Sequence, residues 1–128
     1  MPFEQSELVE LKQVRGKGRG VFARARIGRG GIIERVPVIV IPLREVYDRG
    51  EGSKLGDYVF MWNREKAAIA LGYGSMYNHS YDPNARYDDG RLTKTFTAIR
   101  DIAPGEEITV NYNGDPGDES DVGFPVVD

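Results

Sequence analysis

Three short segments contain the residues whose types and spacing could do chemistry. Segment 15–23, RGKGRGVFA, alternates glycines with cations and ends in an apolar pair. Segment 72–84, GYGSMYNHSYDPN, gathers Asn, His, Ser and Asp side chains between aromatic residues. Segment 101–114, DIAPGEEITVNYNG, runs from a Pro-Gly turn into an apolar stretch that ends at Tyr112. Each segment also has an ordinary structural interpretation that competes with the chemical one.

The first segment could bring backbone groups close to a ligand. Gly16, Gly18 and Gly20 have no Cβ atom to obstruct such an approach. Backbone amides beside Lys17 and Arg19 would favour an anion such as phosphate. The segment lacks the Gly-Lys-Ser/Thr ending of a Walker loop, and its spacing does not match the dinucleotide-binding pattern. An ordinary hairpin turn is the competing interpretation.

The second segment is rich in hydrogen-bonding side chains. Asn and Asp bond to neighbouring backbone groups, so a loop over 78–84 can be rigid without a metal. His79 acting as a base for Ser75 or Ser80 would indicate a hydrolase. Adjacent His79 and Ser80 point in different directions, however, and no nucleophile elbow is present. A structural hydrogen-bond network is the alternative for Asn78 and His79.

The third segment predicts a strand that carries a tyrosine to its end. Strand alternation places Ile108, Val110 and Tyr112 on one face, and Thr109 and Asn111 on the other. A tyrosine in this position usually packs with its hydroxyl at the rim of the core. The segment alone therefore gives Tyr112 no chemical role.

The elements that position these segments are predicted to be mainly β. Sixteen Gly and seven Pro divide the chain into short pieces. Runs rich in β-branched residues predict strands over 8–14, 32–36, 38–41, 93–99 and 108–112. Turns are predicted at 28–31, 88–90 and 104–105. A single short helix is favoured over 43–48, between Pro42 and the Gly50 region.

Composition limits the class of protein. The 128 residues, 40% of them hydrophobic, suit one domain with one core. With no Cys and one His, the sequence predicts neither disulfides nor a metal site. The absence of a signal peptide or a membrane-spanning stretch of about 20 apolar residues favours a soluble intracellular protein, in cytoplasm or nucleus. A net charge of -3 and a pI near 5.2 argue against nucleic-acid binding and suit a Lys/Arg-rich partner.

Together and in this order, the three segments resemble those of the SET domain protein-lysine methyltransferases. Segment 18–23, GRGVFA, is similar to the family's cofactor motif. Segment 78–84, NHSYDPN, resembles its Asn-His-Ser-x-x-Pro-Asn signature, and segment 105–112, GEEITVNY, resembles its Gly-Glu-Glu-Leu/Ile-Thr-x-x-Tyr ending. The resemblance covers about residues 8–114.

A narrower resemblance links the chain to the small stand-alone SET histone methyltransferases of viruses. Its carriers are segments 57–60, 70–74 and 78–86. This likeness implies a histone-like basic tail as substrate and a homodimer as a plausible assembly. No direct nucleic-acid or membrane partner is expected.

The family resemblance also implies a fold, the β-clip of SET domains. It consists of several small curved sheets, few short helices and a pseudoknot in which the last strand passes under the Asn78 loop. Residues 1–114 would form the SET domain and residues 115–128 a C-terminal arm, either disordered or ordered over the site. Many members have Cys in place of Tyr81 and a zinc-binding segment after the domain. Here the arm, with Phe124, or a second subunit would have to supply the missing wall of the substrate channel.

Finally, the resemblance implies roles for individual residues. S-adenosylmethionine would be bound by Gly18, Arg19, Gly20, Asn78, His79 and Tyr112, with Phe124 covering its adenine. Tyr58, Tyr87 and Val110 would line the lysine channel, where desolvation lowers the pKa of the substrate amine from about 10.4. Tyr112 would be the catalytic residue, aligning the amine. The alternative is a non-catalytic SET-like module that binds lysine or methyl-lysine tails through the same aromatic side chains.

Overall fold

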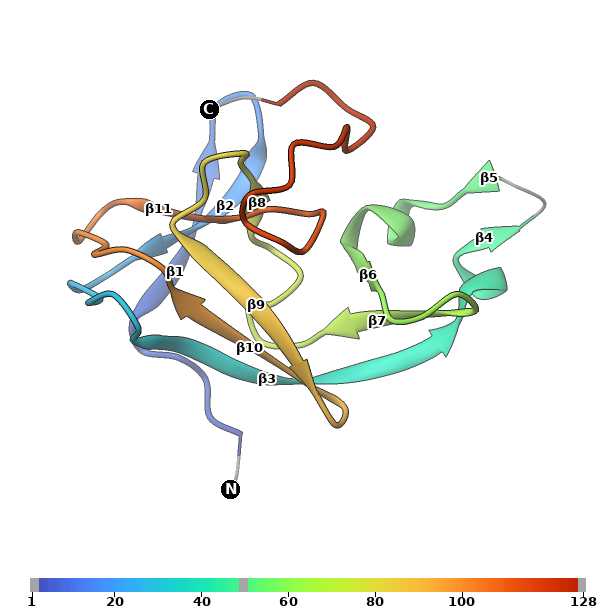
Figure 1. Ribbon diagram of the computed structural model, residues 1–128, viewed down its shortest axis with the longest axis horizontal. Coiled ribbons are helices and arrows are strands. Elements are labelled where there is room, and N and C mark those ends of the chain that lie inside the picture. The colour runs from blue at the N-terminus through green and yellow to red at the C-terminus, as the bar shows by residue number, and fades with distance from the viewer. Residues whose placement is uncertain (1–2, 49–50, 127–128) are drawn as a thin grey trace.

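Short strands form nearly all the regular structure of the computed structural model, which describes residues 3–48 and 51–126 (Figure 1). In chain order the elements are β1 (Val9–Val14), β2 (Gly18–Ala23), β3 (Ile32–Pro42), the 3-10 helix η1 (Leu43–Glu45), β4 (Tyr47–Asp48), β5 (Glu51–Gly52), the 3-10 helix η2 (Lys54–Tyr58), β6 (Val59–Met61), β7 (Lys66–Ala70), β8 (Asn78–His79), β9 (Ala85–Gly90), β10 (Thr93–Ala98) and β11 (Glu107–Val110). The predicted mainly β class is confirmed. Within the described ranges no helix is long and apolar enough to cross a membrane.

The strands form two larger sheets and one small hairpin. One sheet has the order β1-β2-β11-β8, the second has the order β6-β7-β3-β10-β9, and β4 pairs with β5. β11 is antiparallel to β2 and parallel to β8. Figure 1 shows β11 lying across the molecule between the first hairpin and β8. This crossing brings a late part of the chain against two much earlier parts.

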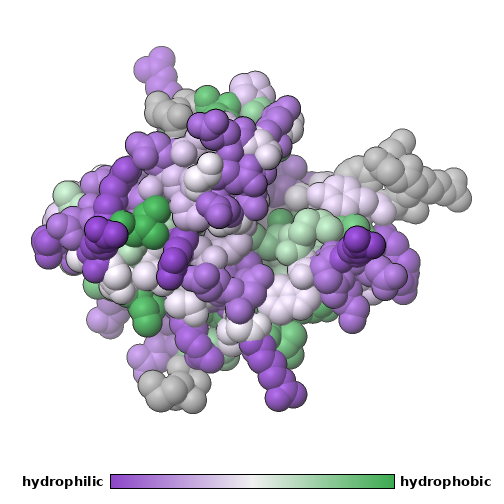
Figure 2. Space-filling model, in the orientation of Figure 1, coloured by the Kyte–Doolittle hydropathy of each residue, from purple (hydrophilic) through white to green (hydrophobic). Residues whose placement is uncertain are grey.

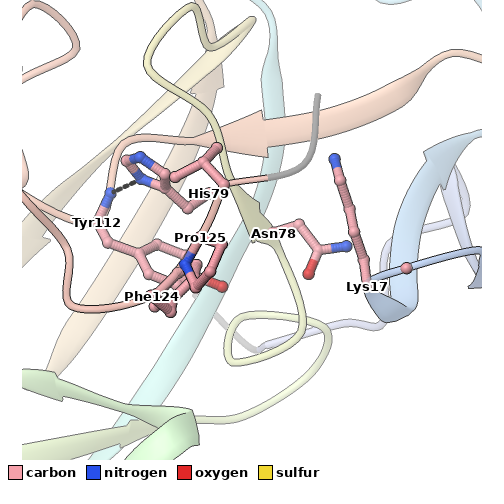
Figure 3. Close-up of a pocket in the computed structure, with 8 residues that line it drawn as sticks. Lys17, Asn78, His79, Tyr112, Phe124 and Pro125 are labelled. Atoms are coloured by element: carbon pink, nitrogen blue, oxygen red, sulfur yellow. Dashed lines mark hydrogen bonds between the residues drawn. The ribbon is translucent and has the colours of Figure 1, made fainter.

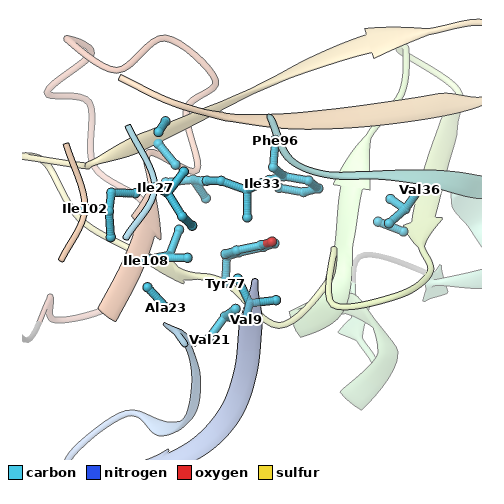
Figure 4. Close-up of a cluster of buried hydrophobic side chains, with 14 of the residues drawn as sticks. Val9, Val21, Ala23, Ile27, Ile33, Val36, Tyr77, Phe96, Ile102 and Ile108 are labelled. Carbon is cyan, nitrogen blue, oxygen red and sulfur yellow. The ribbon is translucent and has the colours of Figure 1, made fainter. Parts of the chain in front are cut away.

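The hydrophobic core lies between the two larger sheets (Figure 4). Val21 of β2 and Ile108 of β11 meet Ile33 of β3 and Phe96 of β10, and all four are almost fully buried. Each side chain of this size contributes roughly 1.5–3 kcal/mol when it leaves water. The core therefore fixes β11 relative to the five-stranded sheet.

One cation is buried beside this core. Lys94 belongs to the inward-facing row of β10 and is 0% exposed. Its ammonium group is paired with Asp89 and lies 4.1 Å and 4.3 Å from the ring centroids of Phe60 and Tyr87. Burial lowers the pKa of Lys94, while the hydrogen bond to Asp89 opposes that shift. Strand alternation places Lys94 on the same face as Phe96, and the pairing with Asp89 makes a buried lysine possible there.

Several predicted boundaries were wrong. The strands predicted over 32–36 and 38–41 are one continuous strand, β3. Pro37 does not interrupt it, because the sheet requires no N–H donor at this position and the Pro37 carbonyl accepts a 3.1 Å hydrogen bond from Leu71 N–H. Residues 88–90 belong to β9, and the turn follows at Leu92, which has a φ of 52°. Strands β2, β4, β5, β6, β7, β8 and β9 were not predicted.

The predicted helix over 43–48 shortens to the 3-10 turn η1. Its N-cap residue, Pro42, has no side chain that could cap the first turn. Tyr47 then leaves the helix to pair with Gly52 in the β4–β5 hairpin. Gly50, which was expected to end the helix, lies outside the described residues.

Candidate active site

The loop over 78–84 is bonded to β11 at both of its ends. At the first end, Asn78 and His79 pair in parallel with Thr109 and Val110. At the other end, the Asn84 amide donates to the Glu107 carbonyl at 2.8 Å, and its oxygen accepts from Thr109 N–H at 2.9 Å. These bonds fix Asn78 and His79 relative to the residues that follow β11.

Tyr112 follows β11 and is held by two hydrogen bonds. Its backbone N–H donates to Nδ1 of His79 at 2.9 Å (Figure 3), and its hydroxyl donates to the Tyr77 carbonyl at 2.6 Å. Burial, followed by the nearby Glu107 charge, raises the pKa of Tyr112 to about 12. The phenol is therefore protonated at neutral pH, with its proton directed at a backbone carbonyl.

The bond to Tyr112 also fixes the chemistry of His79. Because Nδ1 accepts a hydrogen bond, it carries no proton and cannot take one from a serine while the bond lasts. Ser75 bonds instead to the backbone of Ala70, at 3.0 Å and 3.1 Å. The hydrolase interpretation is thus not supported by this geometry.

The amide of Asn78 is oriented by its neighbours. Its Nδ2 donates to the Arg19 carbonyl at 2.9 Å and to Oε2 of Glu107 at 2.7 Å. The other carboxylate oxygen of Glu107 lies 3.2 Å from Nζ of Lys17. Since both amide hydrogens of Asn78 are committed, the oxygen is the group that the side chain can offer as an acceptor.

Gly20 is required by this hydrogen-bond network. A Cβ atom at Gly20 would lie 2.5 Å from Oε2 of Glu107 and 2.9 Å from Nδ2 of Asn78. The glycine therefore makes room for protein side chains. Gly16 and Gly18 differ, because their φ values of 83° and 84° lie in the left-handed region that glycine adopts easily.

These residues surround an open pocket of about 160 Å³ (Figure 3). Its lining residues are Gly16, Lys17, Asn78, His79, Tyr112, Phe124, Pro125 and Val126. The ring centroid of Phe124 lies 5.9 Å from that of Tyr112 and 6.2 Å from that of His79. The pocket thus has a cation and an amide on one side and aromatic rings on the other.

The segment that contributes Phe124 is bonded to the body of the protein. Asn111 Nδ2 donates to the Asp118 carbonyl at 2.6 Å. Asn113 Nδ2 and the Tyr81 hydroxyl donate to the Ser120 carbonyl at 2.7 Å and 3.0 Å. Tyr81 occupies the position at which many SET-like sequences have Cys, and its hydroxyl bonds to Ser120 of the arm.

The structure brings some of the predicted site residues together and separates others. Asn78, His79, Tyr112 and Phe124 share the pocket, whereas Gly18, Arg19 and Gly20 lie beside it on β2 and do not line it. Lys17, Glu107 and the apolar pair Pro125 and Val126 were not predicted. The Gly-Lys-Gly spacing was the one sequence signal that pointed toward Lys17.

The predicted channel residues are divided in the same way. The Tyr87 hydroxyl donates to the Tyr112 carbonyl at 3.4 Å, and both Tyr58 and Tyr87 influence the Tyr112 phenol electrostatically. Val110, in contrast, is 0% exposed within the core and presents no surface to a channel. On the face seen in Figure 2, apolar side chains gather over η2 and β6, beside the arm.

Comparisons with known proteins identify the family. The SET domain family profile matches residues 18–113. The chain therefore belongs to the SET domain family, a family of protein-lysine methyltransferases whose members generally use S-adenosylmethionine.

Three relatives illustrate the range of the likeness. A histone-lysine N-methyltransferase of Schizosaccharomyces pombe, specific for lysine 37 of histone H3, is 33% identical over 81% of this chain and 72% of its own length. The Caenorhabditis elegans histone-lysine N-methyltransferase mes-4 is 30% identical over 84% of this chain but only 14% of its own length. A crystal structure of a Plasmodium falciparum protein assigned to the histone methyltransferases superimposes with a TM-score of 0.68 and 27% identity, covering 85% of this chain and 94% of that one.

Proposed function

We propose that this protein-lysine methyltransferase takes a methyl group from S-adenosylmethionine and transfers it to a lysine of a histone or histone-like basic tail. The observation that carries the proposal is the convergence of Asn78, His79 and Tyr112 on one pocket of a SET domain. The substrate class is supported by the histone-lysine specificity of the fungal and nematode relatives. It would place the enzyme in the nucleus.

The pocket residues suit the polar and aromatic parts of this cofactor. Bound there, S-adenosylmethionine supplies an electrophilic methyl group on a sulfonium centre. The Asn78 amide oxygen is an acceptor for an ammonium group, and Lys17 is a cation for a carboxylate. The Phe124 ring offers a flat apolar surface for a base. Gly18, Arg19 and Gly20 would contribute indirectly, because Arg19 and Gly20 contact the Asn78 network.

Tyr112 would orient the substrate amine. Its hydroxyl proton is directed at the Tyr77 carbonyl, so its oxygen can accept an N–H from the amine. The amine lone pair then remains available for the methyl carbon. With a pKa of about 12, Tyr112 stays neutral and is not expected to act as a general base. Holding the amine and the methyl donor in register as a whole can lower the barrier by roughly 7–11 kcal/mol, and the Tyr112 hydrogen bond is one part of that effect.

Tyr58 and Tyr87 would complete the channel with Tyr112. Aromatic walls remove water from the lysine ammonium group, which disfavours its charged form, whereas the faces of the rings attract the cation. As the channel becomes drier, desolvation outweighs this attraction and favours loss of the proton. The arm carries the acidic residues Asp115, Asp118, Glu119 and Asp121, which give it a negative charge. Such a surface suits a basic tail.

We also propose that residues 115–128 act as an arm that completes the SET domain of residues 1–114. The rings of Phe124 and Tyr112 belong to the same chain, so this wall does not need a second subunit. The likeness to the viral enzymes, and the homodimer that it implied, remain proposals. The non-catalytic alternative is not favoured, since a reader module has no need for the pocket beside Tyr112.

A methyl-transfer assay tests the proposal. The purified protein is incubated with labelled S-adenosylmethionine and a panel of histones and unrelated basic proteins, and modified residues are mapped by mass spectrometry. Label is expected on histone lysines with wild type and with the control variant Tyr47→Phe. This variant also loses one tyrosine hydroxyl, but that hydroxyl contacts Gly56 outside the site. Tyr112→Phe should lose most of it. Absence of lysine methylation from a folded wild-type protein across the panel would refute the assignment.

A further inference from the structure

A buried carboxyl lies behind the active-site tyrosine. Glu34 of β3 is 5% exposed, within the core between the two sheets. Its Oε1 accepts the Tyr77 hydroxyl at 2.8 Å, and its Oε2 accepts Tyr73 N–H at 3.4 Å. Burial raises the pKa of Glu34, while these two hydrogen bonds oppose the shift. Glu34 takes no direct part in the methyl transfer proposed at Tyr112.

Tyr77 connects this carboxyl to Tyr112. Its ring is 2% exposed and stacks on Phe96, with centroids 4.4 Å apart and an interplanar angle of 24°. The carbonyl of the same residue accepts the Tyr112 hydroxyl at 2.6 Å. The backbone of Tyr77 thus presents that acceptor directly before β8, while its side chain is fixed in the core on the opposite side.

The surrounding backbone is shaped to accommodate the carboxyl. Gly72 has a φ of 59°, and a Cβ atom there would lie 2.8 Å from Val36 and 3.1 Å from Oε2 of Glu34. A buried carboxyl also carries a desolvation cost that an apolar side chain would avoid. A purely structural need for core packing therefore does not explain why a glutamate occupies this position.

We propose that Glu34 and Tyr77 are positioning residues for methyl transfer: Glu34 fixes the Tyr77 side chain, and Tyr77 thereby fixes the carbonyl that sets the direction of the Tyr112 hydroxyl. The inference rests on the proposed function and extends it to two residues outside the pocket. Neither residue is among those that line the pocket. Their effect is on the orientation of the Tyr112 oxygen, and hence on the step in which the amine is aligned.

The test compares variants that break the contact with one that keeps it. Tyr77→Phe removes the hydroxyl, and Glu34→Leu removes its acceptor. Glu34→Gln retains an oxygen that can accept from Tyr77. Tyr73→Phe is the matched control in the same loop, because its hydroxyl accepts from Gln5 at an exposed position.

Positioning predicts a loss in kcat without a loss in binding. Tyr77→Phe and Glu34→Leu should each lower kcat about tenfold, while KM for S-adenosylmethionine and for a histone peptide stays within about twofold. Glu34→Gln should keep kcat within about threefold of wild type, and Tyr73→Phe should match wild type. All rates are measured well below each variant's melting temperature, so that partial unfolding does not enter kcat.

The outcomes separate this inference from the proposed function. An inactive wild type refutes the function itself. An active wild type with wild-type kcat in both Tyr77→Phe and Glu34→Leu overturns the positioning role. If either variant fails to fold, the double variant Glu34→Gln/Tyr77→Phe is used instead, because it lacks the contact but leaves no unpaired carboxylate in the core. The 13Cζ resonance of Tyr112 is then compared between this double variant and wild type. An unchanged Tyr112 resonance in that folded variant also overturns it, and a shift supports it.

Discussion

Replacing Tyr112 by Phe removes a single oxygen atom from the site. The ring keeps its packing against His79 and Phe124, whose centroids lie 5.3 Å and 5.9 Å away. The backbone bond from Tyr112 to His79 is also kept. The change therefore deletes the 2.6 Å bond to the Tyr77 carbonyl and little else.

Stability and rate should respond by different amounts. One lost hydrogen bond between partly exposed groups costs about 0.5–1.5 kcal/mol of unfolding free energy. If the hydroxyl oxygen aligns the amine, the single-turnover rate should fall at least about a hundredfold, which corresponds to about 2.7 kcal/mol of barrier. Cofactor affinity should stay within about twofold, since Lys17 and Asn78 lie across the pocket and do not contact the hydroxyl.

The assay combines single-turnover methyl transfer, calorimetry of S-adenosylmethionine binding and thermal unfolding. Tyr47→Phe serves as the control, because it deletes an exposed hydroxyl with a 3.4 Å contact to Gly56. A Tyr112→Phe protein that binds the cofactor normally, melts normally and transfers methyl groups at the wild-type rate would refute the catalytic role of the hydroxyl.

Three further predictions concern the cofactor, metals and pH. Asn78→Ala should weaken S-adenosylmethionine binding about tenfold in calorimetry, while the loss of its hydrogen bonds to Arg19 and Glu107 lowers the melting temperature without unfolding the protein; a variant that unfolds while its folded fraction binds normally would show that the residue is structural. Activity should survive EDTA, because no group of three or more ligating residues among 3–48 and 51–126 could hold a metal; a loss restored by zinc would contradict this. The pKa of Glu34 is raised above its ordinary value of 4.5, so the folded protein binds the carboxyl proton more tightly than the unfolded chain does. The protonated carboxyl therefore contributes stability that is fully present below pH 4.5. This contribution is lost as the pH rises through the raised pKa of the folded state. Glu34→Gln should abolish this decline in chemical denaturation, and an identical pH dependence in variant and wild type would count against the raised pKa.

Local patterns predicted the parts of the fold that are governed by local forces. The β-branched run before Val14 and the Pro-Gly turn at Gly105 lie close to where they were expected. β8 has two residues and forms only because β11 lies beside it, so no local propensity signals it. Similarly, Leu92 rather than Gly90 adopts positive φ in the β9–β10 turn. The usual preference of positive φ for glycine would not predict this.

The site shows the same limit. The Asn-His and Tyr motifs predicted that the 78–84 loop lies beside the last strand, as it does, because a family signature carries information about distant contacts. Gly20 was expected to bring the backbone close to a cofactor, and local sequence did not predict that the space beside it is filled by Glu107 and Asn78. Val110 follows strict strand alternation into the core, and alternation alone cannot distinguish a core wall from a channel wall.

The position of β11 has a consequence for how the enzyme comes to be active. Glu107 and Ile108 pair with Phe22 and Val21, so this pairing closes a chain segment of more than 80 residues. Closing such long loops is what makes β-rich domains fold in milliseconds to seconds, later than their local hairpins. Tyr112 reaches the pocket only once this pairing forms. A folding intermediate that contains the β1–β2 hairpin and the five-stranded sheet would therefore have no methyltransferase site, and the onset of activity during refolding should coincide with the slowest structural phase.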